Sequence, residues 1–194
     1  MTRAFRGEAL IPLSLQVKVP EGQDGYYRIQ RIPRIPSIPP HTALFRGPVY
    51  ECIASDSPGD LAAYIEATDR MRQPEVGSVL ILGLGLGIVV QAALMNPDVR
   101  EVVAVEQAPE VVRLVGPVYS SDPRFRAIVA DALLWEPPTG GCFDAIWADI
   151  WCQVSPQMLR EARALKARYE AHLHQHWFGF WNEGPAELIF GREA

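Results

Sequence analysis

The hydrophobic pattern of the chain changes character near residue 57. Beyond it, short apolar runs alternate with segments in which apolar side chains recur every three or four positions. The runs predict buried strands and the spacing predicts amphipathic helices. The expected strands span residues 79–82, 101–106, 125–130 and 143–149, and helices are expected at residues 87–95 and 109–115. Because apolar strands with helical crossovers form a parallel sheet covered on both faces, we predict a Rossmann-like α/β fold.

The residues before this point alternate apolar and polar side chains instead. Residues 9–19 and 26–32 do so on either side of the turn-forming sequence PEGQDG, which predicts a β-hairpin. Residues 42–54 predict one or two further strands, interrupted at Gly47-Pro48. The N-terminal part of the chain is therefore expected to be a β structure.

A proline-rich segment follows the expected hairpin. Residues 31–40, RIPRIPSIPP, repeat Ile-Pro every three positions, which matches the turn of a polyproline II helix and excludes an α-helix. We expect a stiff extended spacer or a surface arm, rather than a docking peptide for another protein. With this arm, the N-terminal extension covers residues 1–56 and the main domain covers residues 57–194.

Further helices and a strand are expected at the two ends of the main domain. Ser57-Pro58-Gly59-Asp60 supplies an N-cap, a proline in the first turn and an acid near the positive helix end, so a helix is expected up to Pro74. After Pro156, apolar side chains at helical spacing predict one amphipathic helix of about twenty residues that includes His176. Residues 187–190 predict a short last strand.

Composition narrows the class of protein. The chain is 48% hydrophobic and 21% charged, without an apolar run near eighteen residues, so no membrane span is expected. The first ten residues lack the apolar core of a signal peptide, which predicts a cytoplasmic protein. Cys52, Cys142 and Cys152 are odd in number and form no C-x-x-C pair, so reduced thiols are expected rather than disulfides or a zinc site.

Charge is distributed unevenly along the chain. Residues 1–46 hold seven basic and three acidic side chains, a balance of +4, so the remainder of a chain with net charge −5 carries −9. A basic front could steer an anionic substrate, although solvated strand faces explain the same charges. The overall acidity argues against a protein that coats nucleic acid.

A glycine-rich loop carries the first sign of chemistry. Gly83, Gly85 and Gly87 directly follow the first expected strand of the main domain and open a helix. Glycine lets the backbone turn sharply and lets a ligand approach it closely. Glu106 ends the next strand, 23 residues beyond Gly83, where its carboxylate can accept hydrogen bonds from ribose hydroxyls. This spacing suits either NAD or S-adenosylmethionine.

Two more carboxylates follow the next two strands. Asp131 and Asp149 each stand at the end of an expected strand, and either alone is explained equally well as a helix cap. With Glu106, they place three acids above one glycine loop, which indicates a ligand site. The loop is G-x-G-x-G rather than the dinucleotide pattern G-x-G-x-x-G, and this favours S-adenosylmethionine.

The segments VLILGLGLG, VVAVEQAPEVV, DPRFRAIVADA and FDAIWADIW together resemble the class I S-adenosylmethionine-dependent methyltransferases, most of all their spermidine synthase-like branch. The resemblance covers residues 77–151. It implies that the backbone of the three loop glycines cradles the methionine part of the cofactor. It also implies that Glu106 holds the ribose, that Gln107 belongs to the cofactor site and that Asp131 and Ala132 contact the adenine. Asp149 would lie beside the reacting sulfonium and accept a proton from the acceptor.

Two positions depart from the spermidine synthase pattern. The chain has Leu86 and Cys152 where those synthases have acids, and binding a multiply charged amine needs several carboxylates. We therefore expect transfer of a methyl group to a small molecule. The alternatives are an aminopropyltransferase, a non-catalytic methyltransferase-like domain for binding or assembly, and an NAD-dependent oxidoreductase. An N-P-P-Y type signature is missing after Asp149, so modification of nucleic-acid bases is not expected.

Aromatic and histidine side chains offer further candidates. Trp151, two residues after Asp149, is expected to line the substrate pocket, whereas Trp147 is expected in the core. An exposed aromatic patch at residues 177–181 would indicate a homodimer contact. On a helix, the histidines 172, 174 and 176 do not share a face, and only a strand would align them for a metal. We expect no metal site.

Overall fold

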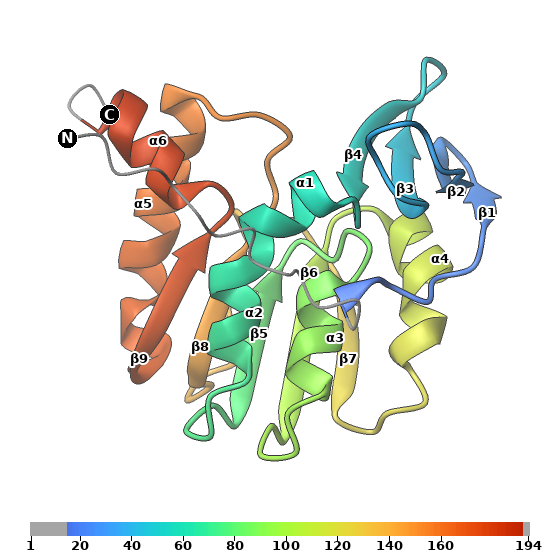
Figure 1. The fold of residues 1–194 in the computed structure, drawn as a ribbon. Helices are drawn as coiled ribbons and strands as arrows, with labels where there is room; N and C mark the ends of the chain where they lie inside the picture. The colour runs from blue at the N-terminus through green and yellow to red at the C-terminus, as the bar shows by residue number, and fades with distance from the viewer. Residues whose placement is uncertain (1–14, 192–194) are drawn as a thin grey trace, which may run out of the picture.

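The computed structural model describes residues 15–191, and its central feature is a five-stranded parallel sheet (Figure 1). The strand order is β7-β6-β5-β8-β9, and every neighbouring pair runs parallel. The strands are Ser78–Leu82 (β5), Glu101–Glu106 (β6), Phe125–Val129 (β7), Phe143–Ala148 (β8) and Leu173–Phe180 (β9). The predicted Rossmann-like α/β fold is confirmed.

Both faces of the parallel sheet are covered by helices. Alternate residues of β5 supply the two faces, with Val79 and Ile81 in one core and Leu80 and Leu82 in the other. The first core includes side chains of the helices Ile65–Met71 (α2), Ile88–Leu94 (α3) and Pro109–Tyr119 (α4). The second includes side chains of Pro156–Tyr169 (α5) and Glu183–Phe190 (α6). Burial on both sides explains the near-continuous apolar runs of the strands.

The N-terminal extension forms a four-stranded antiparallel sheet, which Figure 1 shows at the upper right, next to α4. Its strands, in sheet order, are Gly22–Asp24 (β1), Tyr27–Ile32 (β2), His41–Arg46 (β3) and Glu51–Ser55 (β4). The strands predicted within residues 42–54 are confirmed, with the turn at Gly47 between β3 and β4. The hairpin exists, but it is built from a different first strand.

The predicted first strand, residues 9–19, is wrong where the structure describes it; its residues 9–14 lie outside the described part. Leu15, Val17 and Val19 are buried alternately, as a strand's side chains would be, yet they pack against the core beneath. The backbone N–H of Val17 donates to the carboxylate of Asp56 and not to a neighbouring strand. The hairpin instead turns at Gly25-Tyr26, at the end of the segment predicted as a loop, and Gly25 takes a φ of 53° there.

The proline-rich segment is a compact turn, so the prediction of an extended spacer is wrong. Ile35 and Ile38 exchange two backbone hydrogen bonds of 3.1 Å, which folds the chain back between β2 and β3. Pro36 occupies the first central position of that turn, where a fixed φ near −65° is favourable. The three-residue repeat therefore marks a turn between paired strands.

The junction after β4 connects the two sheets. Ser57 caps a helical segment by accepting a hydrogen bond from the N–H of Asp60, as predicted, although the segment is divided into Pro58–Leu61 (α1), the 3-10 turn Ala62–Tyr64 (η2) and α2. Asp56 is fully buried, and its carboxylate accepts the backbone N–H of Val17 and that of Thr42. This side chain ties the N-terminal segment and β3 to the start of the main domain.

The C-terminal region differs from the prediction in two places. The predicted long helix ends at Tyr169, passes through the 3-10 turn Glu170–His172 (η3) and continues as β9, because the aromatic residues after it pair with β8 and pack on the sheet. The predicted strand at residues 187–190 belongs to α6. There Leu188 is 88% exposed, so its apolar character reflects no buried strand. Among the described residues, no helix combines the length and the apolar character needed to cross a membrane.

Candidate functional site

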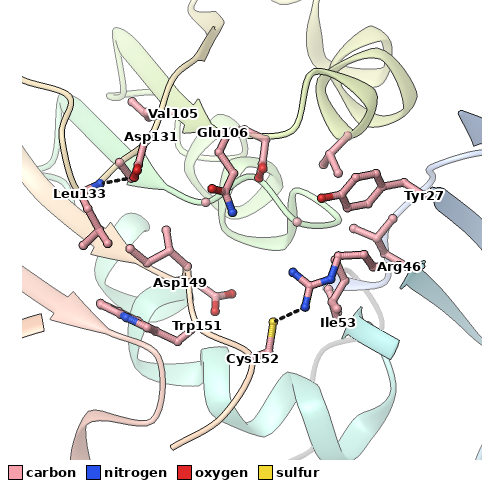
Figure 2. A pocket seen from close by; sticks show the side chains of 18 of the residues that line it. Tyr27, Arg46, Ile53, Val105, Glu106, Asp131, Leu133, Asp149, Trp151 and Cys152 are labelled. Carbon is pink, nitrogen blue, oxygen red and sulfur yellow. Dashed lines mark hydrogen bonds between the residues drawn. The ribbon is translucent and has the colours of Figure 1, made fainter. Parts of the chain in front are cut away.

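A cavity lies at the carboxyl ends of the parallel strands, where the chain leaves β5, β6, β7 and β8 (Figure 2). It contains about 930 Å³ of empty space, part of it continuous with solvent. This edge of an open parallel sheet is where α/β proteins bind small molecules. The residues predicted to bind cofactor or substrate that line it are Gly83, Gly85, Glu106, Gln107, Asp131, Ala132, Asp149 and Trp151.

The glycine loop forms the floor of the cavity, and its glycines have different reasons to be glycine. Gly83 has a φ of +96°, and a Cβ added there would lie 2.1 Å from the carbonyl oxygen of Asp149. Gly85 also has a positive φ, but only the Ala54 side chain lies within 4 Å of its added Cβ, so this backbone faces open space. Gly87 does not line the cavity: an added Cβ would lie 2.4 Å from the ring of Tyr119.

Glu106 links the end of β6 to the glycine loop. One of its carboxylate oxygens, Oε2, accepts the backbone N–H of Leu84 at 3.0 Å, and Oε1 accepts that of Ala108 at 2.9 Å. These two bonds fix the orientation of the carboxylate toward the cavity. Each oxygen keeps a second lone pair, so the group can also accept hydrogen bonds from a ligand's hydroxyls.

The loop after β7 places Asp131 and Ala132 at one end of the cavity. Asp131 Oδ1 accepts the N–H of Leu133 at 2.9 Å, which shapes the turn (Figure 2). From α5, the guanidinium of Arg168 donates to the carbonyl oxygens of Ala132 (3.0 Å) and Leu133 (2.5 Å). The Tyr169 hydroxyl donates to the carbonyl of Trp135 at 2.9 Å. The sequence analysis missed Arg168 and Tyr169, because nothing in their spacing connects them to this loop.

Asp149 projects into the middle of the cavity from the end of β8 (Figure 2). Its Oδ2 accepts a hydrogen bond of 2.7 Å from the hydroxyl of Tyr64. Burial raises the pKa of Asp149 from its ordinary 3.8 to about 6; the Tyr64 bond opposes the rise and the Glu106 charge adds to it. Burial and the Asp149 carboxylate raise the pKa of Tyr64 well above its ordinary range, so its hydroxyl remains a donor. Asp149 is therefore a carboxyl group that titrates near neutral pH.

The antiparallel sheet closes the other side of the cavity, a contribution that the sequence analysis did not foresee. Tyr27 from β2 and Arg46 from β3 are partners in the sheet register, and both point into the cavity (Figure 2). Arg46 Nη2 donates to Glu51 at 2.9 Å and to Cys152 Sγ at 3.8 Å. Ile53 and Ala54 of β4 also line this wall.

A second hollow of about 520 Å³ adjoins the cavity at Asp149. The residues that line both spaces are Ile53, Ala54, Asp149, Trp151 and Cys152. Beyond them, the second hollow is bounded by the polar side chains of Cys52, Ser55, Asp60 and Tyr64 and by the ring of Trp181. Asp149 thus stands where two adjoining spaces meet.

Trp151 and Leu86 occupy different positions in this arrangement. Trp151 lines both spaces, and its indole N–H donates to Glu161 at 2.8 Å, which holds the ring in place. Leu86, at the loop position where the synthases have an acid, is 1% exposed and belongs to the core under the loop. A side chain at position 86 therefore does not reach the cavity in this backbone.

Of the remaining aromatic candidates, Trp181 borders the second hollow, while those on β8 and β9 lie in the core or pack against it. Trp147 is buried as predicted and stacks on Trp177, with ring centroids 5.9 Å apart. Phe178 and Phe180 are buried on the opposite face of the sheet, so β9 presents no exposed aromatic patch in its described side chains. Because β9 is a strand, the histidine segment is not the predicted helix; the side chain of His176 lies outside the described part of the chain, and among the side chains that are described no group of three or more histidine, cysteine or acidic residues could hold a metal.

Comparison with known proteins agrees with this architecture. No family model matches the chain, and no curated protein matches it. Among solved structures, the spermidine synthase of Thermotoga maritima aligns over 91% of this chain and 62% of its own, with 18% identity and a TM-score of 0.56. A spermidine synthase in complex with the transition-state analogue AdoDATO aligns over 85% and 57%, with 17% identity and a TM-score of 0.53. The SAH-bound methyltransferase PaMTH1 of Podospora anserina aligns over 69% and 54%, with 16% identity and a TM-score of 0.49.

The likenesses to the two spermidine synthases establish a fold. The chain has the α/β fold of the spermidine synthases, and its antiparallel N-terminal sheet lies within the aligned 91% of the chain. It spans less than two thirds of the length of each of these three proteins.

Proposed function

We propose that this protein is an S-adenosylmethionine-dependent transferase that moves a methyl group to a small-molecule acceptor. The observation that carries the proposal is the convergence of Glu106, Asp131 and Asp149 with the Gly83–Gly85 backbone around one cavity. Such a reaction needs an open glycine backbone, two polar anchors for a nucleoside and one carboxyl group beside the reacting position.

The residues present fit an adenosyl cofactor. The open backbone at Gly85 allows close approach by a ligand, since a side chain there would project into the cavity. Glu106 offers its carboxylate to the two ribose hydroxyls, and Asp131 with the backbone of Ala132 offers an acceptor and a donor to the adenine.

When bound, S-adenosylmethionine supplies a methyl group on a positively charged sulfur. Asp149 orients the acceptor, which reaches it from the second hollow, and takes the proton that the nucleophilic atom loses. Its pKa of about 6 leaves it mostly ionised at neutral pH and still able to hold a proton. Tyr64 fixes Oδ2 through its 2.7 Å bond, and Trp151 and Cys152 border both spaces, where they limit the acceptor's size.

Calorimetry on the complete chain tests the cofactor. We expect S-adenosylmethionine and its product S-adenosylhomocysteine to bind with dissociation constants well below a millimolar. Glu106→Ala should weaken both by about tenfold or more, because a charged acceptor of two hydroxyl bonds is lost. Glu101→Ala is the matched control: it removes a carboxylate from the other end of the same strand, where Glu101 pairs with the exposed Arg126. It should leave both affinities unchanged.

The same titrations separate the alternatives. If the wild type binds NAD more tightly than S-adenosylmethionine, the protein is an oxidoreductase and the proposal is overturned. If neither ligand binds at millimolar concentration, the cofactor proposal is overturned and the non-catalytic binding or assembly domain becomes the leading alternative. Because Glu106 also accepts the backbone N–H groups of Leu84 and Ala108, urea unfolding of Glu106→Ala is measured beside the titrations, and only a loss of affinity in a variant that remains folded counts as the loss of a ligand contact.

A further inference from the structure

We propose that Arg46, with Tyr27 beside it, is the subsite that binds the carboxylate of the cofactor's methionine, so that the protein selects the carboxylated over the decarboxylated cofactor. The inference rests on the proposed function, which names the cofactor but not this contact. Both residues come from the antiparallel sheet, whereas the glycine loop and the strand-end acids follow strands of the parallel sheet.

The position of Arg46 relative to the nucleoside anchors is the first argument. Asp131 and Leu133 lie at one end of the cavity, Glu106 in its middle, and Tyr27 and Arg46 at the other end (Figure 2). A ligand whose adenine contacts Asp131 and whose ribose contacts Glu106 extends its remaining atoms past Gly83 and Gly85. They reach the wall formed by the antiparallel sheet.

The hydrogen-bonding capacity of Arg46 is the second argument. Its bonds to Glu51 and to Cys152 both leave from Nη2, and a further side-chain hydrogen bond joins it to Tyr27, so two of the five N–H donors of the guanidinium remain for a ligand. A guanidinium can bind a carboxylate through two such donors. The phenol of Tyr27 is part of the same wall: burial raises its pKa and the Arg46 charge opposes the rise, so it remains protonated and can donate as well.

The charge of the cavity is the third argument. Its described lining includes four acidic side chains, Glu106, Asp131, Asp149 and Glu161, and one basic side chain, Arg46. Without Arg46, such a cavity would favour the decarboxylated cofactor, which carries one more positive charge than S-adenosylmethionine. Arg46 places the single opposing charge at the end where the carboxylate would lie.

The carboxylate that Arg46 binds is assigned to the cofactor and not to the acceptor, because Arg46 does not line the hollow through which the acceptor enters. Arg46 and Tyr27 line the cavity that contains the glycine loop and Glu106, and neither lines the adjoining hollow at Asp149 and Asp60. An acceptor entering through that hollow meets acidic and aromatic groups instead. The two faces of Asp149 thus separate an anion-binding end from the acceptor end.

Calorimetry with S-adenosylmethionine and with its decarboxylated form, on the complete chain, measures the preference directly. We expect the wild type to bind the carboxylated form about tenfold to a hundredfold more tightly, the loss typical of one charged hydrogen-bonded pair. Arg46→Gln should reverse the preference, by weakening the carboxylated form while the decarboxylated form binds at least as tightly as before. Tyr27→Phe should reduce the preference by a smaller factor, since it removes one neutral donor.

Arg126→Gln is the matched control for Arg46→Gln. Arg126 also lies on a strand, is also about half exposed and also pairs with one glutamate, but it does not line the cavity. Its substitution should leave both affinities unchanged. Equal binding of the two forms by the wild type overturns the inference without a variant, and equal weakening of both by Arg46→Gln overturns it too. Binding of neither form by the wild type refutes the proposed function instead.

Discussion

The two sheets of this protein contribute to one cavity in different ways. All strands of the parallel sheet end at the same edge, so the residues that follow β5, β6, β7 and β8 are brought together by topology alone. Neighbouring strands of the antiparallel sheet run in opposite directions, and no single edge collects their ends. This sheet contributes a wall instead, through residues such as Tyr27 and Arg46 that are register partners on neighbouring strands.

The difference is also one of charge. The parallel sheet supplies the acids Glu106, Asp131 and Asp149, while the antiparallel sheet supplies the cation Arg46. The first 46 residues are net basic and the remainder is net acidic, and the same separation of charge is found in the lining of the site. A ligand that carries both signs of charge fits between the two sheets, and each variant below tests what one of them contributes.

The largest expected effect comes from comparing a glycine of each sheet. Gly83→Ala should destabilise the fold by about 3 to 5 kcal/mol and abolish cofactor binding, because the new Cβ would meet the Asp149 carbonyl at a strongly positive φ. Gly47→Ala, in the turn between β3 and β4, has a φ of +77° and no atom within 4 Å, so only the backbone strain of about 1 to 2 kcal/mol remains. Urea unfolding measures the loss of stability in the two variants. Equal losses would contradict the close contact between position 83 and the Asp149 carbonyl.

The next comparison is between two aspartates that each follow a strand. Asp149→Asn should lower the rate of transfer by about a hundredfold or more, because it removes the proton acceptor. It should also stabilise the protein at pH 7 by about 1 to 2 kcal/mol, since the ordinary pKa of 3.8 is raised in the folded state and ionisation therefore opposes folding. This gain should disappear as the pH falls from 6 to 4, where the carboxyl group becomes protonated.

Asp56 follows β4 as Asp149 follows β8, but its role is structural. Asp56→Asn should destabilise the protein by about 2 to 3 kcal/mol, because an amide has one acceptor oxygen for the two backbone N–H groups of Val17 and Thr42. Cofactor affinity, measured by calorimetry on the folded protein, should be unchanged. A loss of affinity with normal stability would place Asp56 in the site and remove the contrast with Asp149.

The sequence predicted one sheet far better than the other, and the reason is physical. In the parallel sheet, buried strands leave apolar runs and their carboxyl ends coincide, so Glu106, Asp131 and Asp149 could be placed together from spacing alone. In the N-terminal part, Leu15, Val17 and Val19 alternate like a strand while packing directly on the core. The true strand β1 has three residues, Gly22–Asp24, too few for a periodic signal.

The sequence did not predict the long-range contacts of the site, because such contacts leave no local pattern. Arg46 and Arg168 act on the site through tertiary contacts, 106 residues from Cys152 and 35 residues from Leu133 respectively, and an arginine on a strand or helix looks like any solvated charge. The aromatic strand β9 was interpreted as helix because Leu173 and His176 continue the apolar stripe of α5 at helical spacing. The sequence Asp122-Pro123-Arg124, by contrast, is structural: Arg124 donates to the carboxylate of Asp122 and to the carbonyl oxygen of Leu94, the last residue of α3.

A smaller effect is expected at the loop that carries Asp131. Arg168→Gln should weaken cofactor binding by about threefold to tenfold and reduce stability by about 1 to 2 kcal/mol, because the carbonyl oxygens of Ala132 and Leu133 lose a charged donor. Arg160→Gln, an exposed change on the same helix, is the control and should do neither. If Arg168→Gln lowers stability but leaves the affinity for S-adenosylhomocysteine intact, the loop does not need this anchor to bind the nucleoside.

The smallest expected effect is a shift in pH dependence at the point where the two spaces meet. The Tyr64 hydroxyl stabilises the ionised form of Asp149, so Tyr64→Phe should raise the pKa of Asp149 further above about 6. A positively charged sulfonium near Asp149 favours its ionised form, so S-adenosylmethionine should bind less tightly below pH 6, and this decline should begin at a higher pH in the variant. S-adenosylhomocysteine, which lacks the charge, should show a weaker dependence in both proteins. Calorimetry of the two ligands between pH 5 and 8 measures the difference, and identical profiles for both would show that Asp149 does not face the reacting sulfur.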